Sequence, residues 1–451
     1  MIDEKLIARI DKAIENERKA LAADVIRLVN IKSVQGDPIP GAPFGPGPRA
    51  VLDKVMDMGR AEGFHATDYG VGVVSLALHE GQPDLGVWLH GDVVPEGEGW
   101  TFPPYDAREY KGCIIGRGAT DNKGQLCAIF HLMKIFKALD VPLGYNLALY
   151  VGSNEETGKH DLTGIPGNPD ARGFCNMCTP PRLSLVPDAG FPVGYGGKGR
   201  IFVKLRADKP LHGLTIAAGL PGSPGRAEAD LNGEHFETFV PPRHAAHPSP
   251  DGNGTTMLMD QLLARELDEY DRTVLTFFRE VTLDIHGAWL GVDKPSEAMG
   301  VSVLSAQEIK MVDGRPEIKV VIRFVDTLTP EEMLAAMGAK AAEYGLSITS
   351  SEVTMRPYLL DKNDEKVQVL TKIANEVRGE EKLPFTLSGG TYAHDLPNAL
   401  VFGMNGCRPP EDFPKGKGGA HGLDESVSLD RLQTAMRIYA RALLTLDGMD
   451  W

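Results

Sequence analysis

The sequence predicts an α/β protein: a main domain with a mainly parallel sheet covered by helices on both faces, and an inserted α+β domain. Three observations support this fold class. Strand-like and helix-like segments alternate up to about residue 190, and several strand-like segments end in clusters of His, Asp and Glu. The pattern then changes before returning near residue 358. We therefore expect residues 1–197 and 358–451 to form one domain and residues 198–357 to be inserted into it, with functional groups at the strand ends.

In the first part of the chain, each predicted element follows from apolar spacing or from turn residues. Apolar residues three and four apart predict a helix over residues 3–30. A Pro- and Gly-rich loop, 36–48, precedes a second helix that ends at Gly63. Short apolar runs predict strands at 71–78, 85–89, 145–151 and 183–186, and a longer run predicts a helix at 126–139.

In the inserted part, residues 198–357, the predicted strands and helices no longer alternate one by one as they do before residue 190. Strands are predicted at 201–207 and 227–231, one or two helices at 255–281, and a hairpin over 299–326 that turns at Asp313-Gly314. Thr329, followed by Pro330, begins a helix that reaches about residue 344. Beyond residue 357 we expect a helix at 363–377, a strand at 399–404 and a last helix from Ser428.

Composition limits the classes of function. A chain of 451 residues with 42% hydrophobic residues can bury two cores. A formal net charge of −15 argues against nucleic acid or an anionic membrane as partner and is compatible with cation binding. The N-terminus is not a basic and apolar leader, and no apolar run approaches the roughly 20 residues that span a bilayer, so we expect a cytoplasmic protein.

The five cysteines do not suggest a disulfide framework, because their number is odd and the chain is long. Cys175 and Cys178 have the spacing of a redox motif but lack its strand-to-helix context and a second pair. We interpret them as two ordinary thiols.

Three polar clusters between residues 89 and 158 carry the chemistry. In LHGDVVP, His90 and Asp92 lie two apart and share a face of a strand, so Asp92 can bind the second nitrogen of His90. In GRGATDNKG, Asp121 lies in a glycine-bracketed turn, where a carboxylate could bridge two ions. In GSNEETG, Glu155 and Glu156 point different ways, so that one can bind a metal while the other acts as a base.

Two further clusters complete a possible metal site. Asp188 follows the strand at 183–186, and His421 lies in a loop before the last helix. A single histidine at a strand end is usually a hydrogen-bonded core residue, so the whole set carries the inference. It comprises two imidazoles and three carboxylates, which suits two zinc ions sharing one carboxylate, with manganese or cobalt as alternatives. The five candidate ligands are His90, Asp121, Glu156, Asp188 and His421.

The clusters HGDVVP, GRGATDNKG, NEETG, PDA and HGLDE, in this order, resemble those of the co-catalytic di-zinc peptidases. That family includes aminoacylases, glutamate carboxypeptidases and PepV-type dipeptidases. The resemblance implies that His90 and Asp188 hold one zinc, that Glu156 and His421 hold the other, and that Asp121 bridges them, often with a cis bond to the next residue. It also implies that Glu155 is the general base and that Asp92 supports the first histidine.

The inserted domain resembles the family's lid. The segment 243–249, RHAAHPS, is similar to the motif of the transition-state histidine, with His247 the better match and His244 the alternative. Arg323 resembles the lid arginine that binds the substrate carboxylate. The loop residues Gly389, Gly390 and Thr391 resemble the lining of that pocket in the PepV-type branch. Because the insertion has the size of the enlarged PepV-type lid, the resemblance implies that His247 acts within its own chain and that the protein is a monomer, with a dimer as the alternative.

Two departures from the PepV-type pattern fall on substrate-facing parts. PepV-type lids usually have an asparagine near the segment 217–224, and none is present here. PepV-type sequences often have an arginine after the Gly-Gly-Thr-Tyr-Ala segment, whereas this chain has His394-Asp395.

The resemblance implies a metal-dependent dipeptidase acting on short peptides with a free carboxylate. The first alternative is an amidohydrolase that removes the acyl group of an N-acyl amino acid, as aminoacylases and desuccinylases do. The second is a binding protein without activity, which the intact ligand set and Glu155 argue against.

Overall fold

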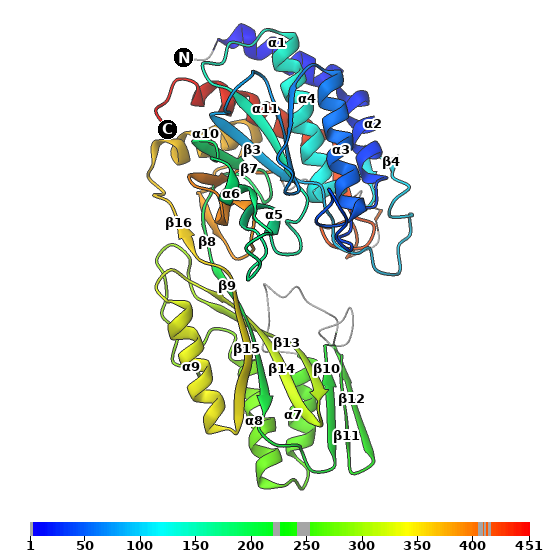
Figure 1. Cartoon of the computed structure of the whole chain (residues 1–451), viewed down its shortest axis with the longest axis vertical. Helices are drawn as coiled ribbons and strands as arrows, with labels where there is room; N and C mark the ends of the chain where they lie inside the picture. The colour runs from blue at the N-terminus through cyan, green and yellow to red at the C-terminus, as the bar shows by residue number, and fades with distance from the viewer. Residues whose placement is uncertain (1–2, 220–225, 241–252, 405–408, 410–411, 414–415) are drawn as a thin grey trace. The chain divides into compact units, whose positions relative to one another are not determined.

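The computed structural model describes residues 3–219, 226–240, 253–404, 409, 412–413 and 416–451. The chain forms two compact units (Figure 1). The first comprises Met1–Tyr195, Leu360–Phe385 and Thr391–Trp451, and the second comprises Gly196–Leu359 and Thr386–Gly390. That the second unit acts as a lid stays a prediction.

The first unit is built on a mixed sheet with a parallel centre. Its strands, in spatial order, are β1 (His65–Asp68), β2 (Val73–Ala77), β6 (Leu147–Gly152), β3 (Leu85–His90), β7 (Leu183–Val186), β18 (Ala399–Val401) and β8 (Gly194–Gly197). The four strands β6, β3, β7 and β18 are parallel to one another, whereas β1, β2 and β8 pair antiparallel at the flanks. The predicted α/β class with a mainly parallel sheet is thus confirmed at the centre of the sheet.

The helices of this unit begin and end where the sequence has capping residues. Asp3 caps α1 by accepting a hydrogen bond from the Lys5 amide, and Gly379, with a φ of 63°, ends α10. The helix predicted over 3–30 is two helices that meet at Glu17, whose carboxylate bonds His131 of α4. The helices are α1 (Glu4–Asn16), α2 (Arg18–Val29), α3 (Pro46–Ala61), α4 (Gly124–Ala138), α5 (His160–Thr163), α6 (Phe174–Met177), α10 (Glu365–Arg378) and α11 (Leu429–Leu446).

The sheet is covered by α4 and by an aromatic cluster. Helix α4 packs on β3 and β6 and is buried along almost its whole length, as its unbroken apolar sequence predicts. Trp88 of β3 stacks on Tyr150 of β6 with ring centroids 4.1 Å apart, and Phe174 of α6 packs edge-on against both rings. The strands that carry the candidate site therefore have a rigid base.

A small antiparallel sheet joins two distant stretches of the first unit. Its order is β19 (Ser426–Ser428), β5 (Cys113–Ile115) and β4 (Arg108–Tyr110), with Ser426 opposite Ile115. This pairing fixes the residues before Asp121 beside those after His421, although some 300 residues separate them in the chain. None of these three short strands has a clear signal in the sequence.

The second unit is a seven-stranded antiparallel sheet packed against three helices. The spatial order is β12 (Glu234–Phe239), β11 (Arg226–Leu231), β10 (Leu214–Ala218), β13 (Val303–Val312), β14 (Arg315–Phe324), β9 (Gly199–Ala207) and β15 (Leu346–Met355). The hairpin predicted to turn at Asp313-Gly314 is β13 and β14. Two short strands, β16 (Tyr358–Leu359) and β17 (Phe385–Leu387), pair with β8.

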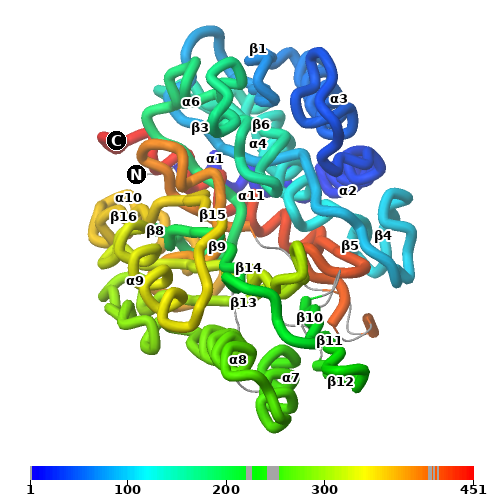
Figure 2. The backbone as a smooth tube through the Cα atoms, turned by 60° about the horizontal axis from the view of Figure 1, so that its bottom comes forward, coloured from blue at the N-terminus to red at the C-terminus, as the bar shows by residue number. Residues whose placement is uncertain are grey.

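The core of the second unit lies between this sheet and its helices. Buried residues alternate with half-buried ones along β9, as expected where one face of a sheet is covered. The covering helices are α7 (Gly254–Leu263), α8 (Glu269–Leu283) and α9 (Pro330–Glu343), which share one apolar cluster with the strands. Helices α7 and α8 pack side by side (Figure 2). Among the described residues, no helix of either unit combines the length and apolarity needed to cross a bilayer.

Candidate metal centre

The candidate ligands gather at one edge of the central sheet. His90 is the last residue of β3, Glu156 follows the end of β6, and Asp188 lies two residues beyond β7. These strands are parallel, so the segments that follow them emerge at the same edge. This is the arrangement that the sequence predicts for the strand-end clusters.

The first group of possible ligands contains His90, Asp121 and Asp188. One ligand atom of each lies within 4.8 Å of the others, and His90 Nε2 is 3.0 Å from Asp121 Oδ1. The Asn122 side-chain amide donates a 2.9 Å hydrogen bond to Asp188 Oδ1 and so orients that carboxylate. No motif of the sequence indicates this hydrogen bond of Asn122.

The second group contains Asp121, Glu156 and His421. His421 Nε2 lies 3.0 Å from Glu156 Oε1 and 3.1 Å from Asp121 Oδ2. Asp121 belongs to both groups and directs one carboxylate oxygen toward each, which is the geometry that a bridging ligand requires. The peptide bond between Asp121 and Asn122 is cis, as the family resemblance implies.

The three carboxylates of the cluster repel one another, and bound cations would offset this repulsion. Burial raises the pKa of Asp188 to about 8 and that of Glu156 above its ordinary value, and the nearby Asp121 carboxylate adds to both shifts. Burial would also raise the pKa of Asp121, but hydrogen bonds from His421 and His90 hold it low. Three clustered carboxylates and two imidazoles are a donor set that fits two divalent ions, because hard oxygen and imidazole ligands suit such metals.

Asp92 connects the first histidine with the two adjacent glutamates. His90 Nδ1 lies 3.0 Å from the backbone carbonyl of Asp92 and 3.5 Å from its carboxylate. That buried carboxylate accepts hydrogen bonds from the Glu155 and Glu156 amides, each 3.1 Å long. Glu155, which lies in neither ligand group, has a pKa well above its usual range because of burial and the charge of Asp188. Asp92 therefore holds both the histidine and the segment of the predicted base.

The comparison with known families agrees with this arrangement of side chains. Over residues 87–445 the sequence matches the description "Peptidase family M20/M25/M40". The chain belongs to this peptidase family. The matched region contains all five candidate ligands, and the membership confirms the resemblance inferred from the motifs.

Several relatives of this M20 chain match it over nearly its whole length. The Bacillus subtilis (strain 168) protein named "Putative dipeptidase YtjP" is 25% identical over 472 residues, covering 95% of this chain and 98% of that one. Human carnosine dipeptidase 1 has a similar fold, with a TM-score of 0.60, 16% identity, and coverage of 98% of this chain and 99% of that chain.

A bacterial M20 structure has a name that bears on metal content. Bacillus subtilis YXEP, described as a dinuclear metal binding peptidase, gives a TM-score of 0.51 at 12% identity, covering 96% of this chain and all of that one. At such identities the likeness to solved structures concerns the fold. The M20 membership and the two ligand groups of this chain together support a metal-binding peptidase.

The predicted substrate residues of this M20 chain lie in different units. Arg323, on β14 of the second unit, is mostly buried, and burial together with Arg200 lowers its pKa to about 10. Gly389 and Gly390 also belong to the second unit, whereas Thr391 belongs to the first. Their roles stay predictions.

The turn at residues 391–395 makes hydrogen bonds and an ion pair with residues of the segment that follows Glu155. Lys159 Nζ lies 2.5 Å from Asp395 Oδ2 and donates to the Thr391 carbonyl at 3.2 Å. Asp161 accepts hydrogen bonds from the Ser153 amide and the Tyr392 hydroxyl. The sequence offered no signal for Asp161, because it looks like an ordinary residue at the start of a helix.

The predicted transition-state histidine, His247, lies outside the described residues. The same holds for the alternative, His244, and for the rest of the segment 243–249. Their assignment rests on the sequence.

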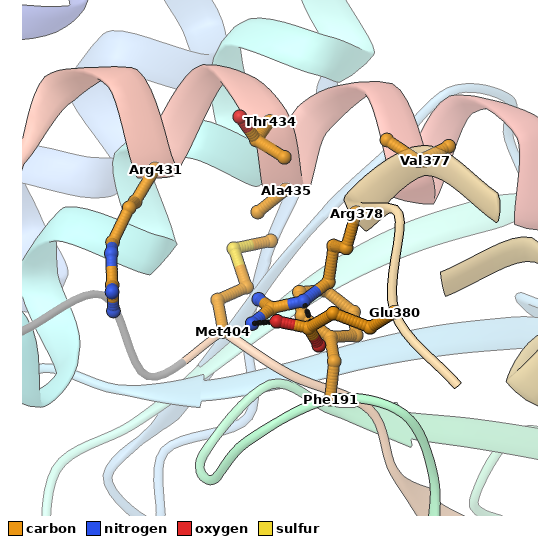
Figure 3. A pocket seen from close by; sticks show the side chains of 8 residues that line it. All are labelled: Phe191, Val377, Arg378, Glu380, Met404, Arg431, Thr434 and Ala435. Carbon is orange, nitrogen blue, oxygen red and sulfur yellow. Dashed lines mark hydrogen bonds and ion pairs between the residues drawn. The ribbon is translucent and has the colours of Figure 1, made fainter. Parts of the chain in front are cut away.

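A separate cavity of about 290 Å³ lies in the first unit of this M20 chain (Figure 3). Arg378 lies over the ring of Phe191 and pairs with Glu380 through two 2.8 Å hydrogen bonds. The full lining is Phe191, Val377, Arg378, Glu380, Met404, Arg431, Thr434 and Ala435. It includes none of the five candidate ligands, so this cavity is not the metal centre.

Proposed function

We propose that this M20 chain is a metal-dependent dipeptidase that cleaves the amide bond of dipeptides or short peptides with a free carboxylate. The observation that carries the proposal is that two ligand groups share Asp121, while Glu155, the neighbour of the candidate ligand Glu156, belongs to neither group. The dipeptidase names of full-length relatives support the choice of substrate class.

The proposed cofactor is a pair of divalent ions, most simply Zn²⁺, with Mn²⁺ or Co²⁺ as alternatives. His90 and Asp188 would hold one ion, Glu156 and His421 the other, and Asp121 both. Such ions lower the pKa of water and polarise a carbonyl group.

The residues of the chain would then carry the proton transfers and the binding of substrate. Glu155 would take a proton from the attacking water and return it to the leaving amine, because it is a carboxylate that neither ligand group uses. His247 would donate a hydrogen bond to the oxyanion. Arg323 would bind the free carboxylate of the substrate beside Gly389, Gly390 and Thr391. We propose that each chain supplies its own His247 and is active as a monomer.

The test is hydrolysis by protein that has been freed of metal and then reloaded with Zn²⁺, Mn²⁺ or Co²⁺. Its substrates are dipeptides, the same dipeptides with an amidated C-terminus, and N-acyl amino acids. We expect cleavage of free dipeptides, loss of activity with a chelator, recovery with metal, and weak cleavage of the amidated forms. Glu155→Gln is the control for contaminating peptidases.

Each other outcome has a definite meaning. Full activity in the metal-free protein would refute a metal mechanism. Faster cleavage of N-acyl amino acids than of any dipeptide would favour the amidohydrolase alternative. Metal binding without turnover of either class would favour a binding protein.

A further inference from the structure

A buried ion pair contacts the backbone of two candidate ligands, Asp121 and His421. Arg117 and Glu425 are almost wholly inaccessible, and Arg117 Nη1 lies 2.7 Å from Glu425 Oε2. Arg117 comes shortly before Asp121 in the sequence, and Glu425 comes shortly after His421. The mechanism proposed above uses neither residue.

The carboxylate of Glu425 organises the turn that carries Asp121. Its Oε2 accepts a 3.0 Å hydrogen bond from the Gly118 amide, and its Oε1 accepts 3.0 Å bonds from the amides of Thr120 and Asp121. With Arg117, four donors converge on this one carboxylate. Because the Asp121 amide itself donates to Glu425, this carboxylate fixes the backbone of the candidate bridging residue.

Arg117 reaches the second ligand loop. Its Nη2 lies 3.4 Å from the backbone carbonyl of His421 and 3.3 Å from that of Glu96, and its guanidinium lies over the ring of Trp100 at 5.1 Å. The Gly116 amide also donates to the Glu425 carbonyl at 2.9 Å. The pair therefore contacts the backbone on both sides of the centre, at Asp121 and at His421.

Stability alone is a weak reason for such a pair. Taking two charges out of water costs several kcal/mol for each ion, and apolar replacements of buried pairs are often neutral or stabilising. What an apolar pair cannot do is to accept three backbone amides of one loop and to donate to a carbonyl of another. The geometry thus points to orientation of the two loops.

We propose that Arg117 and Glu425 are positioning residues that fix Asp121 and His421 relative to each other and so set the geometry shared by the two metal-ligand groups. This inference rests on the proposed metal-dependent function and names the residues that make its centre possible. Groups behind metal ligands typically change metal affinity or activity by 10- to 100-fold when they are replaced.

The direct test is Glu425→Gln. The amide nitrogen of glutamine is a donor, so it opposes at least one of the backbone amides that now donate to Glu425. We expect Co²⁺ or Zn²⁺ affinity, measured by competition with a chelator, to fall by about 10- to 100-fold. The visible absorption spectrum of the Co²⁺-loaded protein should also change, since that spectrum reports ligand geometry.

The matched control is Glu317→Gln in the second unit. Glu317 is also mostly buried and pairs with Arg206 through hydrogen bonds of 2.8 and 3.0 Å. We expect this variant to unfold at a lower temperature but to keep the wild-type metal affinity and Co²⁺ spectrum.

A second variant covers the case in which Glu425→Gln does not fold. Arg117→Lys keeps the charge opposite Glu425 but has a single ammonium in place of the planar fork, so it cannot also reach the His421 carbonyl. We expect a smaller loss of metal affinity, again with a changed spectrum. Wild-type affinity and spectrum in a folded variant at either position would overturn the proposal, as would an equal loss of affinity in Glu317→Gln.

These readouts separate this inference from the proposed function. If wild-type protein binds metal but cleaves no peptide, and Glu425→Gln weakens that binding, the function fails and the positioning role stands. If wild-type protein cleaves dipeptides and Glu425→Gln binds metal normally, the positioning role fails and the function stands.

Discussion

Replacing Asp92 by asparagine should weaken catalysis as well as the fold. The Asp92 carboxylate is 1% exposed and accepts the amides of Glu155 and Glu156 at 3.1 Å each. Asparagine has one acceptor oxygen, and its NH₂ group would face the second amide. The variant therefore loses one charge-assisted hydrogen bond and leaves one buried donor unpaired.

The size of this effect follows from those two contacts. A buried donor left unsatisfied costs about 1–3 kcal/mol, and the other bond weakens when its acceptor loses its charge, so we expect a total of about 2–4 kcal/mol. If this whole cost adds to the activation free energy, kcat/KM falls roughly 30- to 1,000-fold, since each 1.36 kcal/mol is a factor of ten in rate.

The assay is kcat/KM on the best dipeptide, with metal content and thermal unfolding measured on the same preparation. Asp271→Asn is the matched control, because Asp271 is also 1% exposed and accepts the His212 amide at 2.9 Å in the second unit. We expect Asp271→Asn to lower the unfolding temperature with little change in kcat/KM. Asp92→Asn with kcat/KM within threefold of wild type would refute the reasoning.

Three further results are expected. Glu155→Gln should keep its full metal content while kcat falls about 10²- to 10⁴-fold, as for loss of a general base; loss of metal instead would make Glu155 a ligand. Mixing inactive Glu155→Gln with inactive His247→Ala protein should restore no activity if His247 acts within its own chain, and clear recovery would show that it acts between chains. His131→Ala should lower the free energy of unfolding by about 2–3 kcal/mol near pH 6, measured by thermal or urea unfolding. This loss of stability should become smaller as the pH rises. The reason is that burial lowers the pKa of His131 but hydrogen bonds to Asp24 and Glu17 raise it above 6.5 overall, so its stabilisation is complete below pH 6.5 and is lost as the pH rises through the folded-state pKa. An unchanged cost up to pH 9 would contradict this.

The sequence predicted the central sheet because its signals are local. Apolar runs such as β3 and β6 are buried on both faces, and their polar ends mark the edge at which the candidate ligands gather. The hairpin of β13 and β14 was predicted from Asp313-Gly314, since that dipeptide favours the turn. These elements depend on nearby residues alone.

The elements that sequence reasoning missed depend on distant partners. Strand β15 is exposed over most of its length, so its sequence has no apolar alternation, and it becomes a strand by pairing with β9. The break between α1 and α2 at Glu17 places that carboxylate against His131, far away in the chain. No local pattern shows either contact.

The same limit applies to the centre itself. His90, Asp121, Glu156, Asp188 and His421 could be named from motifs, and the structure brings them together in two overlapping groups. The supporting contacts of Asp161 with Tyr392, and of Arg117 and Glu425 with each other's loops, could not be named, because each joins segments that are distant in sequence. An acidic or basic residue of that kind is usually interpreted as part of a solvated surface.

The order of the ligands along the chain has a consequence for synthesis. His90, Asp121 and Asp188, which make one group, are all translated before the second unit, whereas His421 comes near the end of the 451 residues. At roughly 5–20 residues per second, a ribosome needs on the order of 10–50 s to pass from Asp188 to His421. When Asp188 has been made, the nascent chain therefore contains every residue of one ligand group, but it still lacks His421 and also Glu425, which holds the Asp121 amide. Under the proposed function, we expect such a chain to hydrolyse no peptide until nearly the whole polypeptide has left the ribosome.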